Sequence, residues 1–242
     1  MAAWLLESHQ YEMLRDGALV TLQILAYAFV IGAALSVLVG VARLSHRRWV
    51  RGLALVYVEF FRGISSIVLL TIVAIAVPIL FDVRAAPLVL LGSLALGANM
   101  GGYGAEIVRG AIQAIPRGQS EASIALNLSN TQRLRYVVLP QALRIILPPF
   151  GNLTIEILKG TALVSLVGLT DIMQATLNIR QQQLFSAGAA DRTVLFMNVL
   201  VIYFVLAQVI NGLFRLAERR VERRFAGGEA EVLAAELPGG TK

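Results

Sequence analysis

Residues 109–144 read RGAIQAIPRGQSEASIALNLSNTQRLRYVVLPQALR, a polar and basic segment between long apolar runs. The segment is too long for a simple connector, and its pattern is too regular for a flexible linker. Pro116 and Gly118 mark its start, and residues 121–126 follow with a short helical pattern. We therefore expect an ordered helical loop outside the apolar runs.

Capping signals divide this loop into two short helices. Asn127 is expected to end the first helix, because asparagine tolerates the left-handed conformation in which many helices end. Ser129 with Gln132 three residues later fits a capping box that opens the second helix. Pro140 is expected to break or kink that helix, since proline has no backbone N–H to donate. The expected result is two short helices at an angle, exposed beside the membrane.

The flanking runs are apolar enough to cross a bilayer. Hydrophobic residues make up 57% of the 242 residues and charged residues only 15%, against about a quarter charged in soluble domains. A membrane-spanning helix needs about 20 apolar residues. The sequence predicts an all-α integral membrane protein with five transmembrane helices, at residues 18–42, 52–81, 85–105, 145–173 and 193–214.

The distribution of arginine predicts the orientation. Basic residues gather between the first two spans, in the loop at 109–144 and after the last span, whereas residues 82–84 between the second and third spans hold one acid and one base. Because basic loops stay in the cytoplasm, the N terminus is expected outside and the C terminus inside. This topology accounts for the net charge of +6 without nucleic-acid binding.

Several kinds of site have no signature in this sequence. Cysteine is absent, and two histidines, His9 and His46, are too few for a histidine-based zinc site, so we predict no metal site. No phosphate-binding loop of the form G-x-x-x-x-G-K-[ST] occurs, so we expect no cofactor and no ATPase site in this chain. No nucleophile elbow occurs either, and we predict no catalytic residue and no enzymatic activity.

The loop at 109–144 resembles the EAA loop of ATP-binding-cassette importer permeases, although Asn127 stands where that family usually has glycine. In that family the loop forms coupling helices, which sit in a groove of the ATPase subunit and transmit its closure to the membrane spans. The alternative is an amphipathic helix on the membrane surface, which Arg133 and Arg135 would also suit. Val138 belongs to the match as well, and the residues to which the resemblance assigns coupling are Glu121, Ala122, Ser123, Asn127, Leu139 and Pro140.

The resemblance extends over most of residues 17–215. It includes EFFRGISS (59–66), GGYGAEIVRGAIQAIPRGQ (101–119), LPPFGN (147–152) and LKGTALVSLVGLTD (158–171). These motifs resemble the polar amino acid permeases of the histidine/glutamine type, and therefore imply the type I importer permease fold. Gly160 and Ala162 stand where the common pattern has an acid and a serine. ALNLS (125–129), FFRGISS (60–66) and KGTALVSL (159–166) resemble the permease subunits of ectoine/hydroxyectoine importers, in particular the one usually labelled C. Glutamine, arginine, histidine and cystine stay open as substrates.

Charged residues inside the predicted spans are candidates for a substrate pathway. A charge near the bilayer centre costs at least about 2.5 kcal/mol. Glu156 and Lys159 lie three residues apart on one helical face. A zwitterionic solute needs an acidic and a basic partner, so we predict that Glu156, Lys159 and the polar Asn99 line the pathway. The alternative is that Glu156 and Lys159 form a purely structural pair.

Three further charges lie near the cytoplasmic ends of the spans, where burial costs less. We expect Glu59, Arg62 and Glu106 to form ion pairs that fix the packing of the helices.

The resemblance also implies the organisation of the chain and its partners. Residues 1–17 would be an extracytoplasmic segment, 18–217 the permease domain with its EAA loop at 109–144, and 218–242 a disordered cytoplasmic tail. The chain would lie in a bacterial cytoplasmic (inner) membrane, in contact with lipid. Its partners would be an ATPase dimer that binds the ATP, an extracytoplasmic solute-binding protein and a second permease subunit, with a heterodimer favoured and a homodimer possible.

Two other classes remain open. A stand-alone secondary carrier would usually show more spans and internal repeats, and this sequence has neither. A non-transport scaffold is disfavoured by the organised loop.

Overall fold

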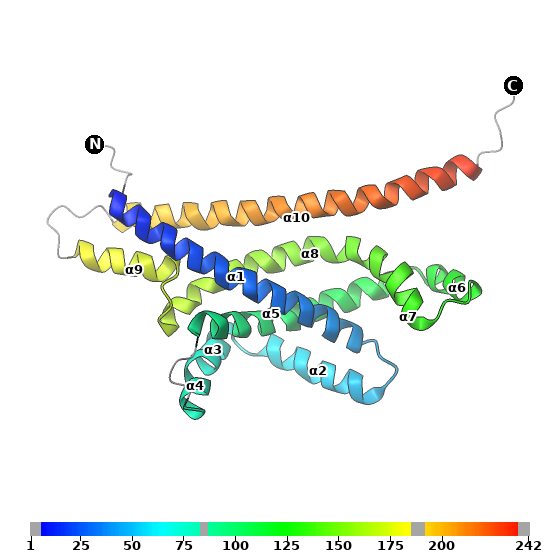
Figure 1. Cartoon of the computed structure of the whole chain (residues 1–242), viewed down its shortest axis with the longest axis horizontal. Helices are drawn as coiled ribbons and strands as arrows, with labels where there is room; N and C mark the ends of the chain where they lie inside the picture. The colour runs from blue at the N-terminus through cyan, green and yellow to red at the C-terminus, as the bar shows by residue number, and fades with distance from the viewer. Residues whose placement is uncertain (1–5, 83–86, 185–191, 237–242) are drawn as a thin grey trace, which may run out of the picture.

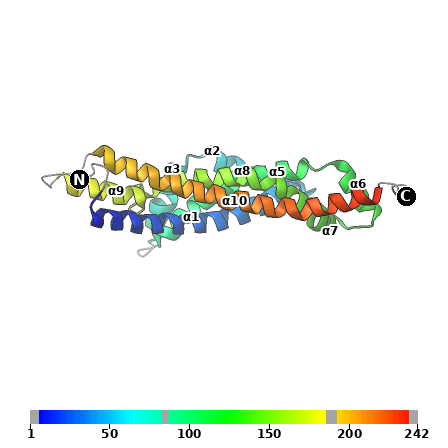
Figure 2. The same ribbon diagram turned by 90° about the horizontal axis from the view of Figure 1, so that it is seen from above.

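The computed structural model describes residues 6–82, 87–184 and 192–236, in which every regular element is helical. Four long helices run along the long axis of an elongated bundle (Figure 1, Figure 2). They are α1 (Ser8–Ala42), α5 (Leu88–Gln113), α8 (Leu139–Gly160) and α10 (Arg192–Glu236). The shorter elements are α2 (Arg48–Gly63), α3 (Ser66–Thr71), η1 (Ile72–Ala76), α4 (Val77–Leu80), α6 (Arg117–Ala125), α7 (Asn130–Arg133), η2 (Leu134–Val138), η3 (Thr161–Val167) and α9 (Ile172–Gln183).

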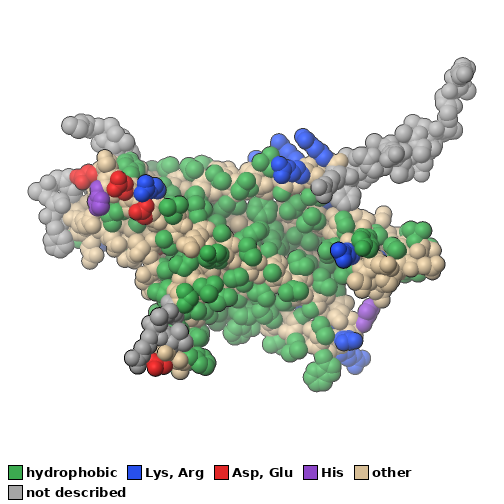
Figure 3. All heavy atoms as spheres, in the orientation of Figure 1, with side chains coloured by type: hydrophobic (Ala, Val, Ile, Leu, Met, Phe, Trp, Pro, Cys, Tyr) green, Lys and Arg blue, Asp and Glu red, His purple; other side chains and the backbone are tan. Residues whose placement is uncertain are grey.

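The surface of the bundle is that of a membrane protein. Hydrophobic side chains cover its middle, and charged side chains gather toward its two ends (Figure 3). One end carries the connection between α1 and α2, with Arg43, Arg47 and Arg48, together with α6 and α7. We call it the basic end. Leu38, Leu53 and Leu200 are among the apolar side chains left exposed on the sides. A continuous apolar belt of this kind fits a lipid environment.

The second predicted span is interrupted. Four helical stretches are long and apolar enough to cross a membrane, and the fifth is a pair, residues 48–63 and 66–80, bent by 102°. The expectation of one helix over 52–81 is therefore corrected. Ile64 and Ser65 take extended backbone conformations at the bend. The Asn99 side-chain amide donates to the Phe61 carbonyl at 2.8 Å. Because α2 ends here, that carbonyl would otherwise lack the hydrogen bond that a continuing helix gives it.

Two π turns each precede a proline. In η1 the N–H of Val77 reaches the carbonyl of Ile72 just before Pro78, and in η2 the N–H of Leu139 reaches Leu134 just before Pro140. Proline has no N–H to donate, and the wider turn carries the chain past that gap. Pro140 therefore does not break the helix, because the helical stretch continues from Asn130 to Val167. Figure 1 shows the ribbon changing direction between α7 and α8, so the expected kink is present without the break.

Small residues allow α1 and α5 to pack closely. Ala28, Gly32, Ser36 and Gly40 are buried at every fourth position of α1, facing a glycine-rich stretch of α5. A Cβ added at Gly32 would lie 2.8 Å from the Met100 side chain. In lipid, helices associate through such close packing, because the tails around them are as apolar as leucine.

The fourth span differs from the expected range of 145–173. It begins earlier, in the helix that continues from α7, and ends at Gly168, whose φ of 88° suits glycine. Asp171 lies beyond the span and caps α9, accepting a hydrogen bond from the Gln174 N–H at 3.0 Å. Asp171 is fully buried, and burial raises the pKa of its carboxyl. The short, polar α9 was not predicted, because it lacks the length of a span.

Both terminal segments are more helical than expected. α1 begins at Ser8, ten residues before the predicted span, and residues 1–5 lie outside the described part. The tail expected over 218–242 begins within α10, which continues as helix to Glu236. Its last turns are rich in alanine, glutamate and leucine, which favour helix. Residues 237–242 lie outside the described part.

Candidate functional site

The loop at the basic end is built from α6 and α7. Figure 1 places both helices beyond the ends of α5 and α8. Asn127 has a φ of 55° and closes α6. The N–H of Leu128 donates to the Ser123 carbonyl at 3.1 Å and that of Asn127 to Ile124 at 2.9 Å, the pattern of a Schellman motif. The predicted left-handed conformation at Asn127 is confirmed.

The second helix of the loop starts as expected. The Ser129 hydroxyl accepts the Gln132 N–H at 3.3 Å, and the Ser129 N–H donates to the Gln132 side chain at 2.9 Å, so the capping box is confirmed. The Gln141 side chain donates to that of Gln119 at 3.2 Å and so links α6 to α8. Since α7 and η2 run directly into α8, a movement of α7 would reach the bundle through continuous helix, whereas α6 is joined to α8 through the turn at 126–129 and the Gln119–Gln141 bond.

The exposed face of α6 only partly matches the predicted coupling residues. Glu121 and Ala122 are exposed, whereas Ser123 is 2% exposed and donates to the Gln119 carbonyl at 2.6 Å. Sequence reasoning missed Ile124 and Leu126, which are 58% and 75% exposed. Residues 117–126 hold no other large apolar side chain, and this was the available signal.

Leu139 and Pro140 lie apart from this face. Both belong to the first turn of α8, and both are half-buried, lining an apolar groove beside α1. The structure therefore does not bring them together with Glu121.

A polar groove of about 480 Å³ runs between α2, α5 and α8. Its charged or polar lining residues are Arg62, Tyr103, Glu106, Asn152 and Glu156. The Arg62 guanidinium carbon lies 5.5 Å from the centre of the Tyr103 ring, and the Tyr103 hydroxyl donates to the Arg62 carbonyl at 3.2 Å. These contacts hold a cation and a ring at one side of the groove.

Of the three charged residues predicted to form ion pairs, Glu106 does so. Its carboxylate lies 3.1 Å from Arg43 of the connection after α1 and 2.6 Å from Arg109 of α5. Among the residues that the structure describes, Glu59 and Arg62, which were expected to pair as well, have no ion-pair partner within 4.0 Å, and both are exposed. The sequence did not single out Arg43 or Arg109 as partners, because they become neighbours of Glu106 only through the helical turn and the packing of α1.

The three predicted pathway residues lie in different surroundings. Glu156 is exposed and lines the groove. Lys159 is also exposed, and within the described part of the chain neither residue has an ion-pair partner within 4.0 Å. Asn99 is 5% exposed and bonds to Phe61 and Ser66. It therefore holds the bend between α2 and α3 and does not line the groove.

This arrangement defines a class: helical membrane permeases with an organised loop at one end. Residues 18–223 match the family described as "Binding-protein-dependent transport system inner membrane component", and the chain belongs to that family. It is thus a permease subunit of the ATP-binding-cassette importer type.

Several relatives carry transport names. A probable amino-acid ABC transporter permease, y4tF of Sinorhizobium fredii, is 42% identical over 86% of each chain. The glutamine transport system permease GlnP of Escherichia coli is 34% identical over 87% of this chain and 93% of its own. The L-cystine transport system permease TcyB of Bacillus subtilis is 29% identical over 92% of each.

Solved structures share the fold. A chain from an amino acid ABC transporter crystallised with histidines has a TM-score of 0.75 and 30% identity, covering 87% of this chain and 94% of that one. The inward-facing MetNI methionine transporter has a TM-score of 0.70 at 24% identity, covering 89% and 99%. The predicted type I importer permease fold is confirmed.

Proposed function

We propose that this chain is the membrane subunit of an importer for a polar amino acid, driven by ATP hydrolysis in a separate subunit. The observation that carries the proposal is the exposed surface of α6 and its C-cap, where Glu121, Ala122, Ile124 and Leu126 are all exposed, on a loop that continues into the bundle. A partner that binds α6 in a groove could pass its own movement on to α8, because the loop is connected to that helix. Membership of an importer permease family supports the same reading.

The basic end would face the cytoplasm, because arginine-rich connections remain on that side. The N terminus would then lie outside, where a solute-binding protein delivers the substrate. The groove between α2, α5 and α8 is open along one side. A second permease subunit, identical or distinct, would close it to form the pathway.

An amino acid suits the charges in the groove. Glu156 would take the ammonium group and Arg62 the carboxylate, while Glu106 is already held by Arg43 and Arg109. A zwitterion whose two charges meet opposite partners loses less solvation free energy on entering the membrane. The relatives named above are permeases for amino acids, glutamine or cystine, and support this class over ectoine.

Competition for uptake tests the substrate class. Cells that carry the native transporter are expected to take up labelled glutamine, and excess unlabelled arginine, histidine or cystine is expected to reduce that uptake more than excess ectoine. Ectoine uptake that resists every amino acid would overturn the amino-acid proposal and return the substrate to the compatible solutes.

Glu156→Gln tests the groove. Loss of a charge-assisted hydrogen bond costs about 1.5–3 kcal/mol, so we expect uptake at subsaturating solute to fall roughly tenfold or more. The complex should still assemble, because Glu156 is exposed and no ion pair is lost. Glu12→Gln, at an exposed carboxylate of α1 far from the groove, is the matched control. Equal uptake by both variants would remove Glu156 from the pathway.

A further inference from the structure

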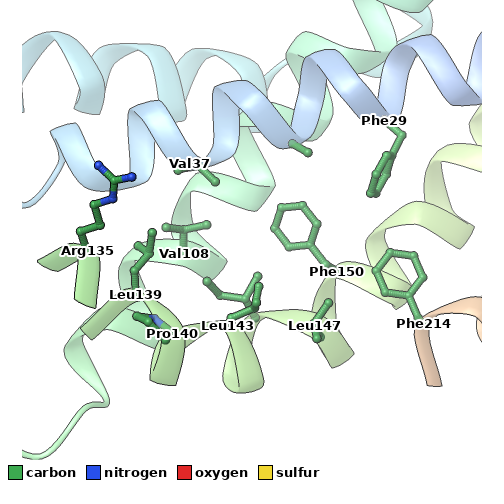
Figure 4. A pocket seen from close by; sticks show the side chains of 12 residues that line it. Phe29, Val37, Val108, Arg135, Leu139, Pro140, Leu143, Leu147, Phe150 and Phe214 are labelled. Atoms are coloured by element: carbon green, nitrogen blue, oxygen red, sulfur yellow. The ribbon is translucent and has the colours of Figure 1, made fainter. Parts of the chain in front are cut away.

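A second groove, on another side of α8, is almost wholly apolar. It measures about 480 Å³, and every side chain that lines it is apolar except Arg135. α1 packs along α5 while α10 packs on α8, which leaves a slot between α1 and α8, with Val108 of α5 and Phe214 of α10 completing its lining. Figure 4 shows Arg135 at one end of the slot and the rings of Phe29, Phe150 and Phe214 at the other. The rings of Phe29 and Phe214 meet edge to face, with centroids 6.1 Å apart.

The slot has the depth of one membrane leaflet. Its floor runs along α8 from Leu139 to Phe150, a rise of roughly 16 Å at about 1.5 Å per residue. Half of the hydrocarbon core is about 15 Å. Arg135 lies one helical turn before Leu139, at the basic end of the slot (Figure 4). In a membrane whose leaflet covers the slot, its guanidinium would meet the head groups of that leaflet.

The chemistry of the slot restricts what can fill it. The walls offer no side-chain hydrogen-bonding group, so an occupant must be apolar along its length and polar at one end only. The polar end meets an exposed guanidinium, which binds phosphate well. An extended peptide would bring backbone N–H and C=O groups that this wall leaves without hydrogen-bond partners.

We propose that this slot binds an anionic phospholipid of the leaflet at the basic end, with one acyl chain between α1 and α8 and its phosphate on Arg135. Basic pockets between helices on the cytoplasmic side of membrane proteins hold anionic head groups in this way. The bound acyl chain fills the gap between α1 and the first turns of α8. The loop would move this same part of α8. The lipid therefore supports the helix that receives the coupling motion, although its binding does not depend on which solute is carried.

The test is native mass spectrometry of the intact transporter complex, purified in detergent and supplied with phosphatidylglycerol or phosphatidylcholine. Wild type is expected to retain phosphatidylglycerol in preference to phosphatidylcholine. Arg135→Gln should lower the affinity for phosphatidylglycerol about tenfold and remove the preference. Leu143→Trp, which fills the slot, should reduce retention of both lipids.

Two matched variants control for general effects. Arg48→Gln removes an exposed arginine at the same end, and Leu53→Trp enlarges an exposed leucine of α2, and neither residue lines the slot. Both are expected to keep wild-type lipid retention. Unchanged phosphatidylglycerol binding in Arg135→Gln would overturn the proposal. Wild type that retains no more lipid than Leu143→Trp would overturn it as well, and would indicate that protein covers the slot.

Discussion

Glu121→Lys is expected to abolish solute uptake while leaving the permease folded in the membrane. Glu121 is exposed on α6, one helical turn before Ile124, which is 58% exposed, and Leu126 at the end of the same helix is 75% exposed. A partner that binds this face through a basic wall would then meet a like charge, which costs several kcal/mol. Since about 1.4 kcal/mol is a factor of ten, we expect at least a tenfold loss in both uptake and ATPase retention.

The measurement is uptake of labelled glutamine in cells, together with the amount of ATPase that copurifies with the permease. Glu12→Lys makes the same change of charge at an exposed residue near the opposite end of the bundle and should behave as wild type. Normal uptake with normal copurification in Glu121→Lys would place the coupling contact elsewhere. In that case Leu126→Asp, which alters the apolar part of the same face, decides whether α6 is the contact at all.

The second large effect is expected at Gly104, in the interface between α1 and α5. A Cβ at this position would overlap the Ser36 hydroxyl and lie 3.0 Å from the Phe150 ring. Ser36 is fully buried and donates to the Gly32 carbonyl at 2.6 Å, so it cannot easily move aside. Overpacking costs about 1–3 kcal/mol even in soluble cores. We expect Gly104→Leu to exceed that range, because α1 and α5 would have to separate along their length.

Size-exclusion chromatography in detergent and thermal unfolding measure this effect. Gly104→Leu should aggregate or unfold well below wild type. Gly110→Leu, on the same helix, is the control, because no atom lies within 4 Å of a Cβ built there. Equal stability of the two variants would show that close packing of α1 on α5 is not required.

Some of the site could be predicted because the responsible interactions are local. Asn127 closes α6 and Ser129 opens α7 through bonds to residues no more than five positions away. The side on which a loop residue lies is a different matter. Ser123 matches the family motif as well as Glu121 does, yet it turns inward to the Gln119 carbonyl.

The class of protein, the approximate positions of the candidate membrane spans and the caps of the loop could all be predicted from the sequence alone. Hydropathy and capping depend on residues that are neighbours in the chain. Which distant segments meet depends on how the helices pack against one another. Packing joins Asn99 to Phe61 at the bend of the second span, sets Glu106 against Arg43, and leaves an apolar slot between α1 and α8. These contacts join residues 38 or more positions apart, and their formation depends on how whole helices pack.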